Sequence, residues 1–357
     1  MAKMIEIKTA VLGMGSVNRN LLKIIARKKE RLARDHGIVF RITAATDSSG
    51  IAIDGRGLDT AALVDHKEAG GCLSDLPSFA GAGRDRVRHL LNALDVDLLF
   101  EATPCGVALD SAGAASNDSR DSEALDICRD ALVRGVSVVL ANKGPLVSAM
   151  NELRALAQTN GTAGRLEYSA TVCGGLPILN IGRRDMVAGT ITKLRGVFNA
   201  TSNFILDAMA GGGTFEKAVK EAQTVGAAEA NPGLDTGGWD TAFKLLIVAN
   251  TIMHANITLA DISVEGIEHI TTDMIRAEAE RGHVIRLEAT AECGGKFLVL
   301  PVSQPMESFL GSITGWEMGI EIHSDIYGIS YHKLYEKEPI PTAASMMRDA
   351  VTIFGCP

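Results

Sequence analysis

The stretch from Ile7 to Asn18, IKTAVLGMGSVN, predicts an apolar strand, a glycine turn and the start of a helix. Ile7 to Leu12 has the composition of a buried strand, and Gly13-Met14-Gly15 follows it directly. The next residues place four apolar side chains on one helical face (Leu21, Leu22, Ile24 and Ile25), and Gly37 should end this helix. A strand, a tight glycine turn and a helix form the context in which GxGxxG binds a dinucleotide. We therefore expect the chain to begin with a dinucleotide-binding unit.

The residues of the glycine turn have expected roles in holding a pyrophosphate. Gly13 permits the tight turn, and Gly15 lets the pyrophosphate approach the backbone. Ser16 and Val17 open the helix, whose N-terminal N–H groups attract anions. Asn18 replaces the third glycine of the motif, so it either pushes the helix outward or turns its amide to a phosphate. The alternative is a glycine-rich turn without a ligand, because so short a match is weak by itself.

A second strand, expected at 39–46, ends at Asp47. An acidic residue at this position binds the ribose hydroxyls of NAD and repels the 2′-phosphate of NADP. Asp47 therefore favours NAD as the cofactor. NADP stays open as the alternative because Arg56 follows within reach of a phosphate.

Strands and helices continue to alternate along the first half of the chain. We expect strands at 96–103 and 136–140, a helix at 123–134, a glycine-rich excursion at 50–90 with a helix near 86–94, and a mobile loop at 111–122. This order predicts an α/β protein with a Rossmann-type, doubly wound parallel sheet. Ligands bind at the strand C-termini of such sheets, so Thr103, Asn142 and Lys143 should border the nicotinamide. A structural lysine at a strand exit is the alternative for Lys143.

Length and composition exclude several classes of protein. The 357 residues predict two domains, and 46% hydrophobic with 22% charged residues is typical of a globular protein. The net charge of −8 argues against nucleic acid as a partner. We expect no membrane segment, because no apolar run approaches the length of a transmembrane helix. The six cysteines form no CxxC pair, so we expect a reducing cytoplasm and neither zinc nor disulfides.

A predicted helix at 239–253 carries two charged side chains, Asp240 and Lys244, among apolar neighbours. A spacing of four residues places the carboxylate and the ammonium on one helical face. One interpretation is that these residues and Thr251 form the solvated stripe of a core helix. The other is that Asp240 holds Lys244 in a cleft, where the lysine donates a proton to substrate.

Four motifs in the same order resemble the homoserine dehydrogenase family, over nearly the whole chain from Val11 to about Ile353. They are Ala141-Asn142-Lys143-Gly144-Pro145, Ala170-Thr171-Val172 with Gly175-Leu176-Pro177, Asn199 with Thr201 and Asn203, and the segment from Glu229 through Lys244. An accidental match at four separated motifs is far less probable than at one glycine loop.

The resemblance implies hydride exchange between NAD or NADP and a small substrate, homoserine or aspartate β-semialdehyde, within amino-acid biosynthesis. It implies that Lys143 and Lys244 are the catalytic lysines, with Asp240 beside them. Four further positions are expected to bind substrate: Glu229, Asp235, Thr201 and Asn203. The chemistry agrees, because aldehyde reduction places negative charge on an oxygen that lysine can stabilise and protonate.

The chain departs from the family pattern at two places. Ser169 stands where relatives carry a glutamate of a monovalent-cation site, although the carbonyls of Val172, Gly174 and Leu176 remain. We therefore expect weak cation binding or none. The segment Leu334-Tyr335-Glu336-Lys337-Glu338-Pro339 replaces a glycine-rich loop of the GxGAG kind.

The resemblance also implies a division into domains. Residues 1–165 should form the dinucleotide-binding domain, with the C-terminal helix at 341–357 packed back on it. Residues 166–340 should form an α+β domain for substrate binding and dimerisation, with strands at 193–199, 297–302 and 319–323. In this family such a sheet makes a homodimer interface; an ordinary domain core is the alternative.

Two other functions remain open from the sequence. Cys173, between Val172 and Gly174, would make the protein an acylating semialdehyde dehydrogenase if its thiolate attacked an aldehyde. That chemistry needs a base or a lowered thiol pKa, and no histidine lies near Cys173 in sequence. A catalytically silent nucleotide-binding protein is the other alternative, suggested by Ser169 and the altered segment at 334–339.

Overall fold

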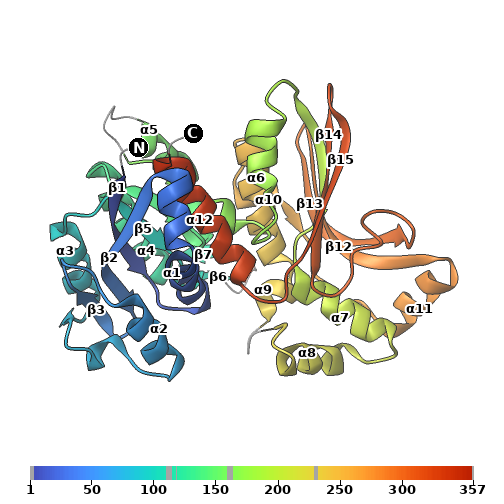
Figure 1. Ribbon diagram of the computed structural model, residues 1–357. Helices are drawn as coiled ribbons and strands as arrows, with labels where there is room; N and C mark the ends of the chain where they lie inside the picture. Colours follow the sequence, from blue (N-terminus) through green and yellow to red (C-terminus); the bar gives the residue numbers. More distant parts are fainter. Residues whose placement is uncertain (1–3, 110–114, 118, 159–163, 229–231, 356–357) are drawn as a thin grey trace. The chain divides into compact units, whose positions relative to one another are not determined.

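The computed structural model describes residues 4–109, 115–117, 119–158, 164–228 and 232–355 (Figure 1). The chain forms two compact units, Met1–Thr171 with Pro339–Pro357, and Val172–Glu338. These divisions differ by a few residues from the boundaries expected at 165/166 and 340/341. The second unit is thus continuous in sequence, whereas the first is assembled from two separate segments.

The first unit is built on a seven-stranded sheet in the order β4-β3-β2-β1-β5-β8-β9. Its strands are β1 (Ile5–Leu12), β2 (Ile38–Asp47), β3 (Gly50–Ile53), β4 (Phe79–Gly81), β5 (Leu98–Glu101), β8 (Ser137–Leu140) and β9 (Leu166–Glu167). The five strands from β2 to β9 are parallel, and β3 and β4 are antiparallel additions. The predicted α/β class with a Rossmann-type parallel sheet is confirmed.

Helices of the first unit follow the strands in sequence. They are α1 (Ser16–His36), α2 (Thr60–Glu68), α3 (Arg84–Ala93), α4 (Ser119–Val133), α5 (Gly144–Gln158) and α12 (Ile340–Phe354), with short 3₁₀ turns η1 (Leu73–Asp75) and η2 (Ser169–Thr171). A small separate sheet pairs β6 (Val107–Leu109) with β7 (Ala115–Asn117). The predicted excursion at 50–90 therefore contains β3, α2, η1, β4 and most of α3. The predicted mobile loop is wrong for 115–117 and 119–122, while 111–114 and 118 lie outside the described residues.

The core of this unit joins residues from both ends of the chain. Ile7 and Leu21 are fully buried, and so are Met346 and Ala350 of α12 in the same hydrophobic cluster. Figure 1 shows α12 lying alongside α1, and the two helices are in contact. Gly37 ends α1 in a left-handed conformation with φ 69°, as expected.

The glycine turn after β1 has the strained geometry that its sequence predicts. Gly13 has φ +84°, and a side chain there would come within 3.0 Å of the Ala102 carbonyl. Asn18 is fully buried, and its Nδ2 donates to the carbonyls of Leu12 (2.9 Å) and Gly13 (2.7 Å). The expectation that its amide faces a phosphate is therefore wrong, because the amide holds the turn, whereas an outward shift of the helix stays a prediction.

The second unit contains a six-stranded sheet in the order β11-β13-β12-β10-β14-β15. Its strands are β10 (Ile191–Val197), β11 (Ser263–Val264), β12 (His283–Glu292), β13 (Lys296–Pro305), β14 (Glu317–Ser324) and β15 (Gly328–Tyr335). Its helices are α6 (Ile178–Asn180), the π-helical η3 (Ile181–Asp185), α7 (Ala200–Ala210), α8 (Phe215–Thr224), α9 (Gly233–Thr236), α10 (Trp239–Ile252), η4 (Leu259–Asp261) and α11 (Thr272–Glu280). Helices α7 and α10 pack against β12. The predicted second sheet is confirmed.

One strand of this unit lies two residues earlier than expected. The strand expected at 193–199 runs from Ile191 to Val197, because Asn199 caps the N-terminus of α7. Among the helices within the described ranges, none has an apolar stretch that would traverse a bilayer. The expected cytoplasmic location stays a prediction.

Replacing Asn18 by alanine should lower the free energy of unfolding by roughly 1–3 kcal/mol, because two hydrogen bonds at a buried turn are lost. Urea denaturation measures this change. Asn20→Ala is the matched control, since its Nδ2 bonds the Ser16 carbonyl (3.0 Å) at an exposed position of the same helix. Equal losses in the two variants would contradict a special role of Asn18.

Candidate active site

Lys244 is a largely buried lysine near the start of α10. Its side chain is 12% exposed, and that of Asp240 is 15% exposed. The ammonium lies 2.7 Å from Asp240 Oδ2 and donates to the Phe198 carbonyl at 2.6 Å. Thr251 is also buried. The interpretation of Asp240, Lys244 and Thr251 as a solvated stripe is therefore wrong.

Asn199 connects the acids around Lys244. Its Nδ2 donates to Asp235 Oδ1 (2.6 Å) and to Asp240 Oδ2 (2.8 Å). Its Oδ1 accepts from the Ser202 N–H (2.7 Å) and so caps α7. The structure thus brings together three predicted residues, Asp235, Asp240 and Lys244, through one that we did not place in the site. An asparagine before a helix-forming run was the available signal for a cap, but nothing in the sequence indicated its two carboxylate partners.

The other predicted substrate-binding residues of this unit have backbone partners. Thr201 Oγ1 donates to the Ala227 carbonyl (2.6 Å). Asn203 is fully buried, and its amide donates to the Glu317 carbonyl on β14 (3.0 Å). Glu229 lies outside the described residues. Substrate-binding roles for these three residues stay predictions.

The strand ends of the first unit bring two predicted cofactor-binding residues together. Asn142 Nδ2 donates to Thr103 Oγ1 (3.2 Å), and Asn142 Oδ1 accepts from the Gly144 N–H (2.9 Å) at the start of α5. Thr103 Oγ1 in turn donates to the carboxylate of Glu101, which is fully buried. Sequence reasoning missed this role of Glu101. Lys143 follows Asn142 in the first unit, whereas Lys244 belongs to the second.

The N-terminus of α1 is open to an anion. Gly15 and Ser16 are exposed, and a Cβ on Gly15 would meet no described atom within 4 Å. The first N–H groups of a helix have no intrahelical partner and carry partial positive charge. Gly13, Gly15, Ser16 and Val17 therefore have the arrangement expected for a pyrophosphate cradle.

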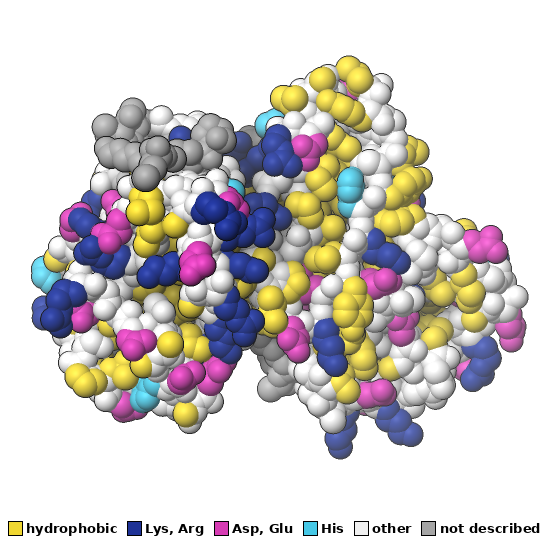
Figure 2. All heavy atoms as spheres, in the orientation of Figure 1, with side chains coloured by type: hydrophobic (Ala, Val, Ile, Leu, Met, Phe, Trp, Pro, Cys, Tyr) yellow, Lys and Arg dark blue, Asp and Glu magenta, His cyan; other side chains and the backbone are white. Residues whose placement is uncertain are grey.

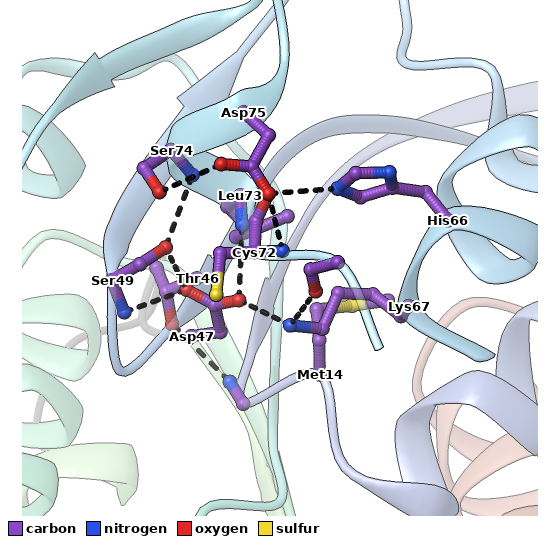
Figure 3. A network of polar contacts seen from close by, with 12 residues as sticks. Met14, Thr46, Asp47, Ser49, His66, Lys67, Cys72, Leu73, Ser74 and Asp75 are labelled. Carbon is purple, nitrogen blue, oxygen red and sulfur yellow. Dashed lines mark hydrogen bonds and ion pairs between the residues drawn. The ribbon is translucent and has the colours of Figure 1, made fainter. Parts of the chain in front are cut away.

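Asp47, at the end of β2, is already engaged within the protein (Figure 3). Its carboxylate forms an ion pair with Lys67 of α2 at 2.5 Å. Burial alone would raise the pKa of Asp47, but the bonds from Lys67 and Ser49 outweigh it and leave that pKa below its ordinary value. Asp47 is therefore a paired charge, and its expected roles toward the ribose of NAD and the 2′-phosphate of NADP stay predictions.

Comparison with known proteins decides the family. The family model for homoserine dehydrogenase matches residues 177–351. The NAD(+)-dependent homoserine dehydrogenase of Pseudomonas canavaninivorans is 35% identical over 275 residues, which cover 76% of this chain and 73% of that protein. Homoserine dehydrogenase of Methanocaldococcus jannaschii is 31% identical over 350 residues, or 97% of this chain and 98% of that protein. The chain belongs to the homoserine dehydrogenase family.

A solved structure agrees with this assignment. Homoserine dehydrogenase from Thiobacillus denitrificans is 27% identical and superposes with a TM-score of 0.80, covering 99% of this chain and 74% of that one. The resemblance drawn from four sequence motifs is thus confirmed, together with the predicted class of enzyme, a dehydrogenase.

Ser169, which stands at the glutamate position of the implied cation site, is bonded within the protein. The Ser169 hydroxyl donates to the carboxylate of Asp349 on α12 and accepts from Arg348 Nη2 (3.1 Å). Among the described residues, no group of three or more His, Cys, Asp or Glu side chains is arranged to hold a metal. Weak or absent binding at the carbonyls of 172, 174 and 176 stays a prediction.

A carboxylate to which the sequence analysis gave no role, that of Glu336, lies on the 172–177 loop. Glu336 Oε2 accepts from the Gly175 N–H at 2.8 Å, and a Cβ on Gly174 would lie 2.2 Å from the same oxygen. The segment that replaces the family's glycine-rich loop therefore inserts an acid where only glycine leaves room.

Asp349 should make stability depend on pH. Burial raises the pKa of Asp349 to about 6, against the opposing hydrogen bonds from Ser169. Because the folded pKa is above the unfolded one, the protonated carboxyl stabilises the fold below about pH 4, and this stabilisation is lost as pH rises to about 6. Over this range the free energy of unfolding of wild type should fall by up to about 3 kcal/mol relative to that of Asp349→Asn. Urea denaturation at stepped pH measures the difference.

The control for this experiment is Asp95→Asn, because the Asp95 side chain is 83% exposed in the same unit. Its pH dependence should run parallel to that of wild type. A parallel curve for Asp349→Asn as well would show that the buried carboxylate does not titrate in this range.

Proposed function

We propose that this member of the family interconverts homoserine and aspartate β-semialdehyde, or a close amino alcohol and its semialdehyde, with NAD or NADP. The observation that supports this most is the ammonium of Lys244, held in a largely buried position by Asp240 and the Phe198 carbonyl. A lysine is costly to bury unless it is paired or employed, and this one is held at a fixed position.

Lys244 is proposed as the acid of the reducing direction. Bound NAD(P)H supplies the hydride. As the hydride adds to the aldehyde carbon, negative charge grows on the carbonyl oxygen, and Lys244 donates a proton to it. In the oxidising direction the same proton passes back from the hydroxyl to the Lys244 nitrogen. Lys143 is the second proposed catalytic lysine, as the family resemblance implies.

The acids are proposed to bind the substrate's ammonium group. Asn199 holds the carboxylates of Asp235 and Asp240 through one amide nitrogen. Charge-assisted hydrogen bonds from an ammonium to such carboxylates are strong and directional. Glu229, three residues before Pro232, is proposed to complete this set. An amino-acid substrate is therefore favoured over an aldehyde without an amine.

The relatives support a nicotinamide cofactor, because the Pseudomonas canavaninivorans protein is named as NAD(+)-dependent. The open N-terminus of α1 supports a dinucleotide at the turn that Gly13 and Gly15 form. A catalytically silent nucleotide-binding protein is less well supported, since an ordered acid–lysine cluster would have no role in it. Acylating chemistry is also less well supported, since Cys173 is only 2% exposed and its Sγ points to the Phe198 carbonyl (3.8 Å).

A homodimer formed through the second sheet is part of the proposal. β15 ends the order of the six-stranded sheet, and Figure 2 shows hydrophobic side chains gathered over β14 and β15. Ile329, Tyr331 and Tyr335 alternate along β15 and are 51%, 53% and 60% exposed. Exposed apolar patches of this kind mark sites of association, and an open sheet edge invites a partner.

Lys244→Ala should lower the turnover number by roughly 10²–10⁴, the usual scale for a lost catalytic acid. The assay follows NADH or NADPH absorbance with aspartate β-semialdehyde as substrate. Arg276→Ala is the matched control, because Arg276 forms an exposed ion pair with Asp273 (3.2 Å) on α11 of the same unit. Turnover by Arg276→Ala should equal that of wild type.

A loss of thermal stability in Lys244→Ala with full turnover in the folded fraction would contradict the proposal.

Cys173→Ala separates the two dehydrogenase mechanisms. It should retain turnover with aspartate β-semialdehyde, whereas an acylating enzyme would lose it completely.

A further inference from the structure

The end of β2 lies next to the glycine turn that is proposed to hold the dinucleotide. The Gly13 N–H donates to the carbonyl of Thr46 (3.1 Å), and Asp47 is the next residue. In folds of this kind the residue at this position faces the adenosine ribose, where NAD carries a hydroxyl and NADP a phosphate. The groups around Asp47 therefore bear on the choice between the two cofactors.

Four donors from the protein already bond the Asp47 carboxylate (Figure 3). Oδ1 accepts from the N–H and the hydroxyl of Ser49, at 2.8 and 2.5 Å. Oδ2 accepts from Lys67 Nζ (2.5 Å) and from the Leu73 N–H (3.1 Å). The Asp47 and Lys67 side chains are 8% and 13% exposed, so the pair is only weakly screened by water. Its charges cancel at the ribose end of the site.

Lys67 is held at this point by its helix and by the following turn. Its ammonium also donates to the Gly71 carbonyl (2.7 Å). The next residue, Glu68, forms an ion pair with Lys23 of α1 at 2.5 Å, which ties the end of α2 to α1. Two acceptors, the Asp47 carboxylate and the Gly71 carbonyl, thus hold the ammonium in place, and an ammonium has three N–H donors.

The neighbouring arginines lie elsewhere. Arg56, named from the sequence as a phosphate ligand, is 94% exposed and pairs with Asp54, whose N–H bonds the Thr43 carbonyl well before the end of β2. Arg19 lies in the first turn of α1, and its Nη1 donates to the Met14 carbonyl (2.9 Å). That position suits the pyrophosphate, which both cofactors share. Lys67 is therefore the cation that the structure places against Asp47.

We propose that Lys67 determines cofactor choice: it cancels the charge of Asp47, so that the site accepts NADP as well as NAD. With NADP, the ammonium stays paired with Asp47 and donates its third N–H to the 2′-phosphate. With NAD, a ribose hydroxyl takes the place of one donor to the Asp47 carboxylate, and Lys67 stays paired. This inference rests on the proposed function, because it assumes a dinucleotide at the Gly13 turn.

The test is titration of the purified protein with NADH and with NADPH, followed by nicotinamide fluorescence and without substrate. Wild type should bind the two with dissociation constants within about tenfold, since a charge-neutral pair discriminates weakly. Lys67→Met should raise the dissociation constant of NADPH by roughly 10- to 100-fold, the scale of a lost charge-assisted hydrogen bond. The dissociation constant of NADH should change by less than about threefold.

Two further variants complete the test. Asp47→Asn removes the acid but keeps Lys67. This variant should bind NADPH at least as tightly as wild type does and should bind NADH more weakly. Lys23→Met is the matched control: it removes a lysine from an ion pair between α1 and α2 and should leave the ratio of the two dissociation constants unchanged. Should Lys67→Met fold poorly, Lys67→Gln removes the charge and retains a polar side chain.

The outcomes separate this inference from the proposed function. Failure of wild type to bind either dinucleotide would overturn both. Binding of both by wild type, with an unchanged ratio in Lys67→Met, would overturn only the role of Lys67. So would a wild type that prefers NADH by more than about a hundredfold, because Asp47 would then act as an uncompensated charge.

Discussion

The candidate active site depends on one ammonium group that is placed in an apolar helix and held by an ion pair and a hydrogen bond. Eleven residues of α10 are buried, so Lys244 enters a region from which water is largely excluded. An isolated charge there would be costly, and the contacts with Asp240 and the Phe198 carbonyl offset that cost. Asn199 then fixes Asp240 from the other side. Removing any member of this set takes a hydrogen bond or an ion pair from another member.

The first unit shows the same principle in a different form. Asp47 and Lys67 are both largely buried, and each satisfies the other. Glu101 is fully buried and accepts from Thr103, which Asn142 bonds in turn. Such chains hold side chains at strand ends in one orientation, which a cofactor site requires. The polar groups of both units are therefore pre-arranged before any ligand arrives.

Sequence patterns predicted the elements that depend on local signals. The glycine turn, the long α1 ending at Gly37 and the parallel sheet all follow from short-range rules, and the family followed from four motifs in order. Partners distant in sequence were not predictable. Lys67 lies twenty residues beyond Asp47 in a segment without a recognisable pattern, and Glu336 meets Gly174 only through the second sheet's connectivity. Asn18 was misjudged because a buried amide can satisfy backbone carbonyls as well as a ligand.

The last helix has a consequence for synthesis of the chain. α12 supplies Met346 and Ala350 to a core whose other residues emerge from the ribosome much earlier. The first unit therefore stays incomplete while the whole second unit is translated, and the surface of α1 that contacts α12 stays uncovered until then. Because the second unit is synthesised completely before α12, we expect it to fold first. Chaperones would then protect the incomplete first unit from aggregation.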